Sequence, residues 1–237
     1  MRKFWNFTAD SGENILHIDG YIAEQSWFDD DITPKQFAAE LNNVEGNLTL
    51  WVNSGGGDCF AASRIYTMLQ EHKNSKKCKV SVKIDALAAS AASVICMAGD
   101  EVLMSPTALL MCHNPASLIF GEVTDLEKGI EMLNEVKESI INAYALKTGL
   151  DRTKISNMMD SETWMNATKA TELGFADGML YKTENETDDE ASPFMWNSAS
   201  MVHSVVAAMR KKLPSKTQQI KTGTPIENLD KRLSLLK

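Results

Sequence analysis

The chain has 237 residues, of which 43% are apolar and 24% are charged. This size and composition are those of a folded globular protein, which excludes a disulfide-stapled mini-protein, a fibrous repeat and a wholly disordered chain. The formal net charge of −8 leaves no excess of lysine and arginine to neutralise phosphates, so we expect no nucleic-acid partner. No apolar stretch reaches the roughly 20 residues of a membrane-spanning helix, so we expect no membrane partner either.

The N-terminal sequence and the cysteines indicate the compartment. Residues 1–6 are followed by polar residues and lack the apolar middle region of a signal peptide. The four cysteines are scattered, with no C-x-x-C pair and no histidines at metal-site spacing. We therefore expect a cytoplasmic protein with reduced thiols, no metal site and no cofactor.

Residues 1–182 alternate between short apolar runs and helical patterns. The region 33–41 begins with a Thr33 cap and has Pro34 at the first helical position, which is typical of a helix start. This alternation predicts an α/β domain with a largely parallel sheet, whose ligand sites lie at the carboxyl ends of the strands. The predicted strands cover 14–22, 48–53, 78–84, 102–104, 109–112 and 179–181, and the predicted helices cover 33–41, 60–72 and 124–147.

The composition changes sharply beyond residue 182. Residues 183–192 are too polar and acidic to form a core, which predicts a linker. Residues 193–237 carry a net charge of +6, against −10 for residues 1–180. We expect a basic, partly helical tail with helices over 195–213 and 225–236. Its apolar and basic face suits docking on an acidic partner, although a solvated tail would have the same composition.

Two segments at predicted strand ends contain residues suited to catalysis. In residues 51–58 a strand leads into Gly55, Gly56 and Gly57, whose bare N–H groups suit an oxyanion; a tight turn explains the same glycines. In residues 84–100, Ser90 stands at the expected start of a helix that stops at Gly99. A serine there is either a nucleophile near the positive end of the helix dipole or an ordinary N-cap.

These segments and two later motifs occur in the order found in the proteolytic subunit of the Clp protease. Over about residues 14–181 the chain resembles that family, and most of all the Clp-like head-maturation proteases of tailed bacteriophages. The resemblance implies a crotonase-like fold of repeated β-β-α turns, here with a C-terminal extension, a Ser-His-acid triad and a self-assembling ring. The four motifs are Asn53-Ser54-Gly55-Gly56-Gly57, Ala88-Ala89-Ser90, Met111-Cys112-His113-Asn114-Pro115 and Ala170-Thr171-Glu172-Leu173-Gly174-Phe175-Ala176-Asp177.

The resemblance implies a role for individual residues. Ser90 matches the nucleophile and His113 the general base, while the N–H groups of Gly57 and Ala91 match the oxyanion-hole donors. Counting back from Gly174 places Glu162 at the position of the third triad member.

Asp160 is the alternative third acid, and both carboxylates also fit solvated helix ends. Helix 124–147 matches the place where the family has an insertion that joins rings, although it also fits a helix packed on its own sheet.

The function that follows is an ATP-independent serine endopeptidase that processes phage scaffold or head proteins, in the host cytoplasm or inside a prohead. The chain has no P-loop motif of its own. Three alternatives stay open: a Clp-type degradation subunit that works with a separate ATPase, a crotonase-type acyl-CoA enzyme, and a noncatalytic assembly subunit. The joint presence of Ser90 and His113 favours a peptidase over the last two.

Overall fold

The computed structural model describes residues 8–10, 13–25 and 31–181, so the expected linker and tail lie outside the described residues. The strands are β1 (Thr8–Asp10), β2 (Glu13–Asp19), β3 (Leu48–Ser54), β4 (Val80–Ala89), β5 (Glu101–Met104), β6 (Leu109–Cys112), β7 (Thr163–Asn166) and β8 (Gly178–Met179). The helices are α1 (Pro34–Leu41), α2 (Cys59–Lys76), α3 (Ala91–Cys96), α4 (Val123–Thr148), α5 (Arg152–Asp160) and α6 (Ala167–Glu172).

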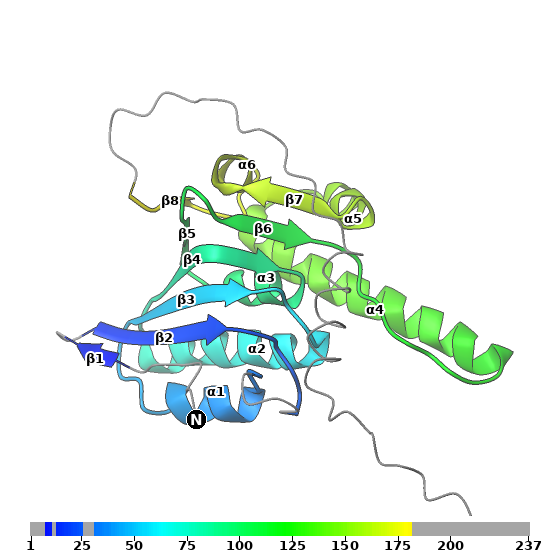
Figure 1. Cartoon of the computed structure of the whole chain (residues 1–237), viewed down its shortest axis with the longest axis horizontal. Helices are drawn as coiled ribbons and strands as arrows, with labels where there is room; N and C mark the ends of the chain where they lie inside the picture. The colour runs from blue at the N-terminus through cyan, green and yellow to red at the C-terminus, as the bar shows by residue number, and fades with distance from the viewer. Residues whose placement is uncertain (1–7, 11–12, 26–30, 182–237) are drawn as a thin grey trace, which may run out of the picture. The chain divides into compact units, whose positions relative to one another are not determined.

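The sheet follows the order β1-β2-β3-β4-β5-β8, and β6 joins it through β4 while β7 pairs with β6. Every pair from β2 to β8 along this path is parallel, as is β4 with β6, whereas β1 and β7 run antiparallel to their neighbours. Figure 1 shows α1 and α2 side by side next to β2 and β3. The expected α/β fold with a largely parallel sheet is confirmed.

Local sequence signals explain where these elements begin and end. The side chains of β3 alternate strictly between buried and half-buried positions, as the two-residue period of a strand with one covered face requires. Helix α1 begins at Pro34 after a capping box between Thr33 and Gln36. Helix α2 begins after Asp58, whose carboxylate accepts a hydrogen bond from the Ala61 N–H.

Strand β4 is longer than the sequence predicted. We expected this strand to end near Asp85, but it continues to Ala89. Its first half pairs with β3 and β5, and its last residues pair with β6, where Leu87 lies opposite Leu109 and Ala89 opposite Met111. Ala88 and Ala89 therefore belong to the strand and pair with β6.

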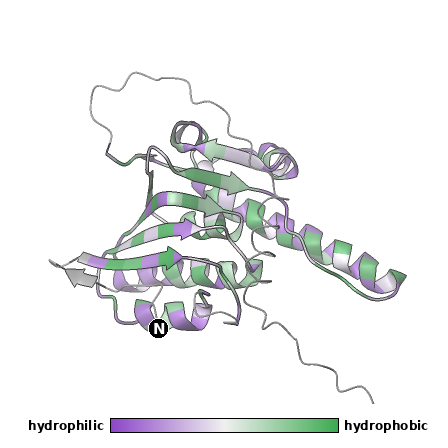
Figure 2. Ribbon diagram, in the orientation of Figure 1, coloured by the Kyte–Doolittle hydropathy of each residue, from purple (hydrophilic) through white to green (hydrophobic). Residues whose placement is uncertain are grey.

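Helix α4 has two different halves. The predicted helix over 124–147 is confirmed, but only its C-terminal half is covered, with Ile140, Ile141 and Tyr144 buried. The N-terminal half extends away from the sheet and contains several hydrophobic residues (Figures 1 and 2). Its exposed apolar side chains include Leu126 and Ile130. Within the described ranges, no helix has the length and apolar character needed to cross a membrane.

Candidate active site

The sheet register brings three of the expected site residues to one place. Ser90 directly follows β4 and His113 directly follows its parallel neighbour β6, and the N–H of Ser90 donates to the carbonyl oxygen of Met111 at 3.0 Å. Strand β7 runs antiparallel to β6 with Thr163 opposite Cys112, so Glu162 directly precedes the residue opposite Cys112. Ser90, His113 and Glu162 therefore meet at the carboxyl ends of β4 and β6.

The backbone of Ser90 has an unusual conformation. Its φ is 55° and its ψ is −126°, which lies outside the regions that L-residues favour. Among the described residues, only four that are not glycine have a positive φ, and Ser90 and Glu162 are two of them. Such strain costs on the order of 1–3 kcal/mol and persists where surrounding contacts fix it, which is common at functional sites.

The Ser90 hydroxyl is directed at a histidine. Ser90 Oγ lies 2.7 Å from His113 Nε2. Although Ser90 is the N-cap residue of α3, its side chain makes no capping hydrogen bond, so the interpretation of this hydroxyl as an ordinary helix cap is wrong. The hydroxyl is free of the helix because the positive φ turns the side chain away from the first turn.

Two opposing effects set the pKa of His113. Burial lowers the pKa of this imidazole below its ordinary value, since a half-buried ring loses hydration of its charged form. The negative charge of Glu162 acts in the opposite direction and raises the pKa, but burial has the larger effect. The lowered pKa favours the neutral ring, in which Nε2 is able to accept the Ser90 proton.

The two candidate acids have different surroundings. Glu162 Oε1 accepts a hydrogen bond from Trp164 Nε1 at 3.2 Å, and among the described residues the carboxylate acts on His113 through charge rather than through a direct hydrogen bond. Asp160 accepts hydrogen bonds from Asn114 Nδ2 at 2.8 Å and from Lys137 Nζ at 2.6 Å. These two bonds, with that of Lys137 the larger cause, lower the pKa of Asp160. Asp160 is thus occupied as an exposed helix-end carboxylate.

The glycine segment lies against the nucleophile. A Cβ atom on Gly56 would stand 2.6 Å from the Ala89 carbonyl oxygen and 2.8 Å from Ser90 Cβ, so only glycine allows this approach. The next residue, Gly57, has a φ of 146°. Its N–H takes no part in the pairing with Ile22, because that residue donates to the Gly56 oxygen and accepts from the Asp58 N–H.

Ala91 supplies a second N–H at the same site. It is the first residue of α3, and the N–H groups in the first turn of a helix have no partner within the helix. A Cβ atom on Gly56 would stand 3.0 Å from the Ala91 backbone nitrogen, so the glycine segment lies against the start of α3.

Comparison with known proteins gives the family. Residues 13–183 match the Clp protease family. A protein of Chlamydia abortus named ATP-dependent Clp protease proteolytic subunit 1 is 29% identical over 155 residues, which cover 64% of this chain and 79% of the relative. The protein of the same name from Chlamydia muridarum is 30% identical over 151 residues, covering 62% of this chain and 77% of the relative. This chain belongs to the Clp protease family.

Members of the Clp protease family are peptidases that form oligomeric rings and act on proteins. The family match ends at residue 183, so the expected tail lies beyond it. The expected relationship to phage head-maturation proteases is a more specific assignment than this family match gives.

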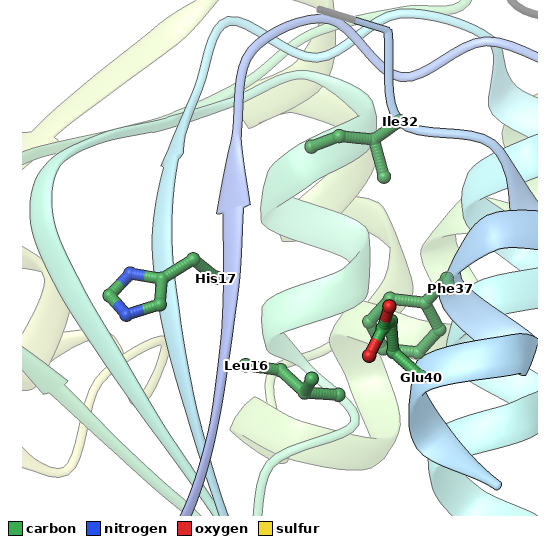
Figure 3. Close-up of a pocket in the computed structure, with 5 residues that line it drawn as sticks. All are labelled: Leu16, His17, Ile32, Phe37 and Glu40. Carbon is green, nitrogen blue, oxygen red and sulfur yellow. The ribbon is translucent and has the colours of Figure 1, made fainter. Parts of the chain in front are cut away.

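The structure also has a small pocket that none of Ser90, His113 and Glu162 lines, and its lining residues do not form a catalytic arrangement. It is lined by Leu16, His17, Ile32, Phe37 and Glu40 (Figure 3). His17 points to the opposite side of β2 from Leu16, as alternate residues of a strand do, so His17 and Glu40 do not face each other (Figure 3). In the part of the chain that the structure describes, no three His, Cys, Asp or Glu side chains are grouped to hold a metal ion.

Three polar residues near the glycine segment and Ser90 have structural contacts that no motif predicted. Ser54 Oγ donates to the Gly20 carbonyl oxygen at 2.6 Å and accepts from the Gly56 N–H at 3.1 Å, which fixes the glycine segment. Ser93 and Tyr144 form a second contact behind the nucleophile. Ser54 belongs to the Asn-Ser-Gly motif, whereas the helical pattern over 124–147 contains Tyr144 without indicating a hydrogen-bond partner for it.

Proposed function

We propose that this member of the Clp protease family is a serine endopeptidase in which Ser90 is the nucleophile, His113 the general base and Glu162 the third triad member. The observation that carries the proposal is the 2.7 Å contact between Ser90 Oγ and His113 Nε2. The lowered pKa of His113 and the strained backbone of Ser90 support it.

The proposed reaction is acyl transfer in two steps. Ser90 Oγ attacks the carbonyl carbon of the scissile peptide while His113 Nε2 takes the serine proton. The N–H groups of Gly57 and Ala91 stabilise the oxyanion, and loss of one such donor costs on the order of 3 kcal/mol of transition-state stabilisation. His113 then protonates the leaving amine, and a water molecule releases the acyl group by the reverse sequence.

Glu162 stabilises the charged imidazole during this reaction. Its charge already raises the pKa of His113, which is the effect a triad carboxylate must have. Glutamate takes this role in some triads, so the change from the family's aspartate is compatible with the chemistry. The engagement of Asp160 by Lys137 and Asn114 favours Glu162 over Asp160.

We further propose that the protein forms a ring and processes scaffold or head proteins of a phage without an ATPase, in the host cytoplasm or inside a prohead. The motifs of residues 53–57, 88–90, 111–115 and 170–177 support this narrower assignment by their resemblance to head-maturation proteases. The exposed apolar half of α4 supports assembly.

A degradation subunit that works with a separate ATPase is the second candidate, because both Chlamydia relatives are named ATP-dependent. Cleavage of a folded or scaffold protein by the purified chain alone favours processing. Cleavage that requires a Clp ATPase and ATP favours degradation.

The test of the serine mechanism is labelling with a fluorophosphonate followed by mass spectrometry of the modified peptide. We expect one adduct on Ser90 in the wild-type protein, no adduct in Ser90→Ala, and a loss of labelling rate of at least ~10³-fold in His113→Ala. The Ser90→Ala variant should keep its thermal stability, since the hydroxyl does not cap α3. Peptide cleavage by Ser90→Ala at the wild-type rate would exclude the proposal.

A further inference from the structure

A buried pair of hydroxyl groups, those of Ser93 and Tyr144, is connected to the backbone of the proposed nucleophile. Ser93 is fully buried in α3, and its Oγ donates to the carbonyl oxygen of Ser90 at 2.6 Å. Ser93 Oγ also lies 2.8 Å from the hydroxyl oxygen of Tyr144, which is buried in the C-terminal half of α4. These contacts connect Tyr144, Ser93 and the Ser90 backbone in one line.

The chemistry of the groups fixes the direction of both hydrogen bonds. The Ser90 carbonyl oxygen is only an acceptor, so Ser93 must donate its single hydroxyl proton to it. Ser93 then has no second proton to give, and the Tyr144 hydroxyl must donate to Ser93 Oγ. A phenolate could not make that second bond.

Burial keeps the Tyr144 phenol protonated, as donation to Ser93 Oγ requires. Burial raises the pKa of the Tyr144 phenol far above its ordinary value, so the phenol stays protonated at every pH at which the enzyme would work. The ring is held in place by Phe175, whose centroid lies 5.3 Å away. Tyr144 is therefore a fixed donor in the core.

The last acceptor in this series of hydrogen bonds is the carbonyl oxygen of Ser90, the residue with the strained backbone. The Ser90 carbonyl also accepts from the Ser93 N–H at 3.0 Å, and the Ser90 N–H donates to Met111. Both polar groups of the Ser90 backbone are thus held, one by β6 and the other by Ser93. A residue with a φ of 55° and a ψ of −126° keeps that conformation only while such contacts compensate for the strain.

We propose that Ser93 and Tyr144 are positioning residues that hold the Ser90 backbone in the conformation directing Oγ at His113. This inference rests on the proposed function, in which Ser90 is the nucleophile. Neither residue touches the reacting atoms, so both act through the geometry of Ser90. A loss of the line lets the Ser90 carbonyl move and lengthens the contact between Ser90 Oγ and His113 Nε2.

The test uses the full-length protein and the first-order rate of Ser90 acylation at saturating fluorophosphonate. We expect a fall of about fivefold in Tyr144→Phe, which removes one hydrogen bond of the line, and of about tenfold in Ser93→Ala, which removes both. The double variant should equal Ser93→Ala, since Tyr144 acts only through Ser93. The concentration of reagent that gives half-saturation should stay unchanged, as should the pH at which the rate is half-maximal.

Tyr66→Phe is the matched control. Tyr66 lies in α2, and its hydroxyl accepts from Gln70 Nε2 at 3.2 Å, so this variant also removes one phenol contact. We expect it to leave the acylation rate unchanged. Thermal unfolding of each variant separates a general loss of stability from a change at Ser90, and Ser93→Ala carries the test by itself if Tyr144→Phe does not fold.

The possible failures are distinguishable. If the wild-type protein labels on Ser90 and both single variants label at the wild-type rate, the positioning role is wrong while the proposed function stands. Effects of Ser93→Ala and Tyr144→Phe that simply add in the double variant also contradict the line, because independent packing losses add. If the wild-type protein does not label on Ser90, the proposed function fails and this inference fails with it.

Discussion

The nucleophile side and the acid side of the site differ in how the chain supports them. Ser90 and His113 follow two paired strands of the sheet, and α3 behind Ser90 is buried along its whole length. Glu162 stands in a turn between α5 and β7, two residues after the exposed Asp160, which pairs with Lys137 of α4. The nucleophile side is backed by a fully buried helix, whereas the half-buried Glu162 stands in a turn beside exposed residues.

This difference explains why the serine and histidine form a direct contact while Glu162 acts on His113 only through its charge. A register between buried strands fixes atoms closely, because a shift by one residue would turn every side chain to the other face. A surface turn has no such constraint, and its carboxylates find other partners such as Trp164 and Lys137. We infer that, within the proposed mechanism, the contribution of Glu162 to catalysis most needs an experimental test.

The largest expected effect that tests this comparison is the loss of the third acid. Glu162→Gln should lower kcat by up to ~10⁴-fold, because the amide keeps the shape of the side chain but cannot stabilise the imidazolium. Asp160→Asn should lower kcat less, since Asp160 already pairs with Lys137 and Asn114. Steady-state hydrolysis of one small peptide by both variants gives the ranking.

The two substitutions are matched, because each replaces a carboxylate by the amide of the same size. A larger loss in Asp160→Asn than in Glu162→Gln would move the third triad role to Asp160. Circular dichroism on both variants checks that the turn before β7 is retained.

The pH dependence of acylation gives a smaller effect of the same origin. Because burial holds the pKa of His113 below its ordinary value, the acid limb of the rate profile should have its midpoint below about pH 6.5. Glu162 raises this pKa, so Glu162→Gln should move the midpoint to still lower pH, whereas Asp160→Asn should leave it in place. A midpoint that moves to higher pH in Glu162→Gln would contradict the proposed charge effect.

The lowered pKa of His113 also predicts how the free energy of unfolding changes with pH. The unfolded chain binds a proton at His113 more readily than the folded chain does, because the pKa is lower in the folded state. The contribution of His113 to the free energy of unfolding should therefore decrease as the pH falls through and below about 6.5. Denaturant unfolding at several pH values, with His113→Gln as reference, isolates this contribution.

Assembly provides a third test, because the acid side adjoins the helix whose outer half is exposed. Leu126 and Ile130 lie four residues apart, so they share one face of α4 and are both exposed in the single chain. We expect the wild-type protein to form a ring, and Leu126→Gln with Ile130→Gln to weaken it at least about tenfold, since burial of each side chain contributes roughly 2 kcal/mol. Light scattering at micromolar concentrations measures the mass.

The control for this substitution is Lys128→Gln with Glu131→Gln, which changes two exposed residues of the same helix without changing the net charge. It should leave the ring intact. A stable monomer of the wild-type protein would contradict the proposed ring, and equal masses for the two double variants would show that this face of α4 does not hold it together.

The parts of the fold that the sequence predicted are those with a strong local pattern. The capped start of α1, the boundaries of β6 and the extent of α4 agree closely with the expectations. Ser90 and His113 were predicted from the resemblance of their motifs to those of the Clp proteases, and the structure brings the two side chains into contact. Their catalytic roles stay predictions.

The missed elements have weak patterns or depend on distant contacts. Helix α5 is polar and buries only Ile155 and Met159, so its hydrophobic period is too faint to identify it. Strand β7 has four residues and exists because β6 pairs with it. The contact between Ser93 and Tyr144 joins residues 51 positions apart, and no local pattern in either segment encodes such a pair.

The smallest expected effect concerns residues 190–237, which contain none of the residues proposed for catalysis. Residues 193–237 carry a net charge of +6, and their apolar positions include Val202, Val205 and Met209. If this segment docks on an acidic partner, such as the −10 core or a scaffold protein, truncation after Asp189 should reduce assembly or copurification with scaffold. Hydrolysis of a small peptide should stay within about twofold of wild type, because every group proposed for catalysis precedes residue 163.

The control is a full-length variant with Arg210, Lys211 and Lys212 changed to glutamine, which keeps the length but removes basic charge. Unchanged oligomer mass and scaffold binding in both proteins would exclude docking and leave the tail as a linker or a segment that the protease removes from itself.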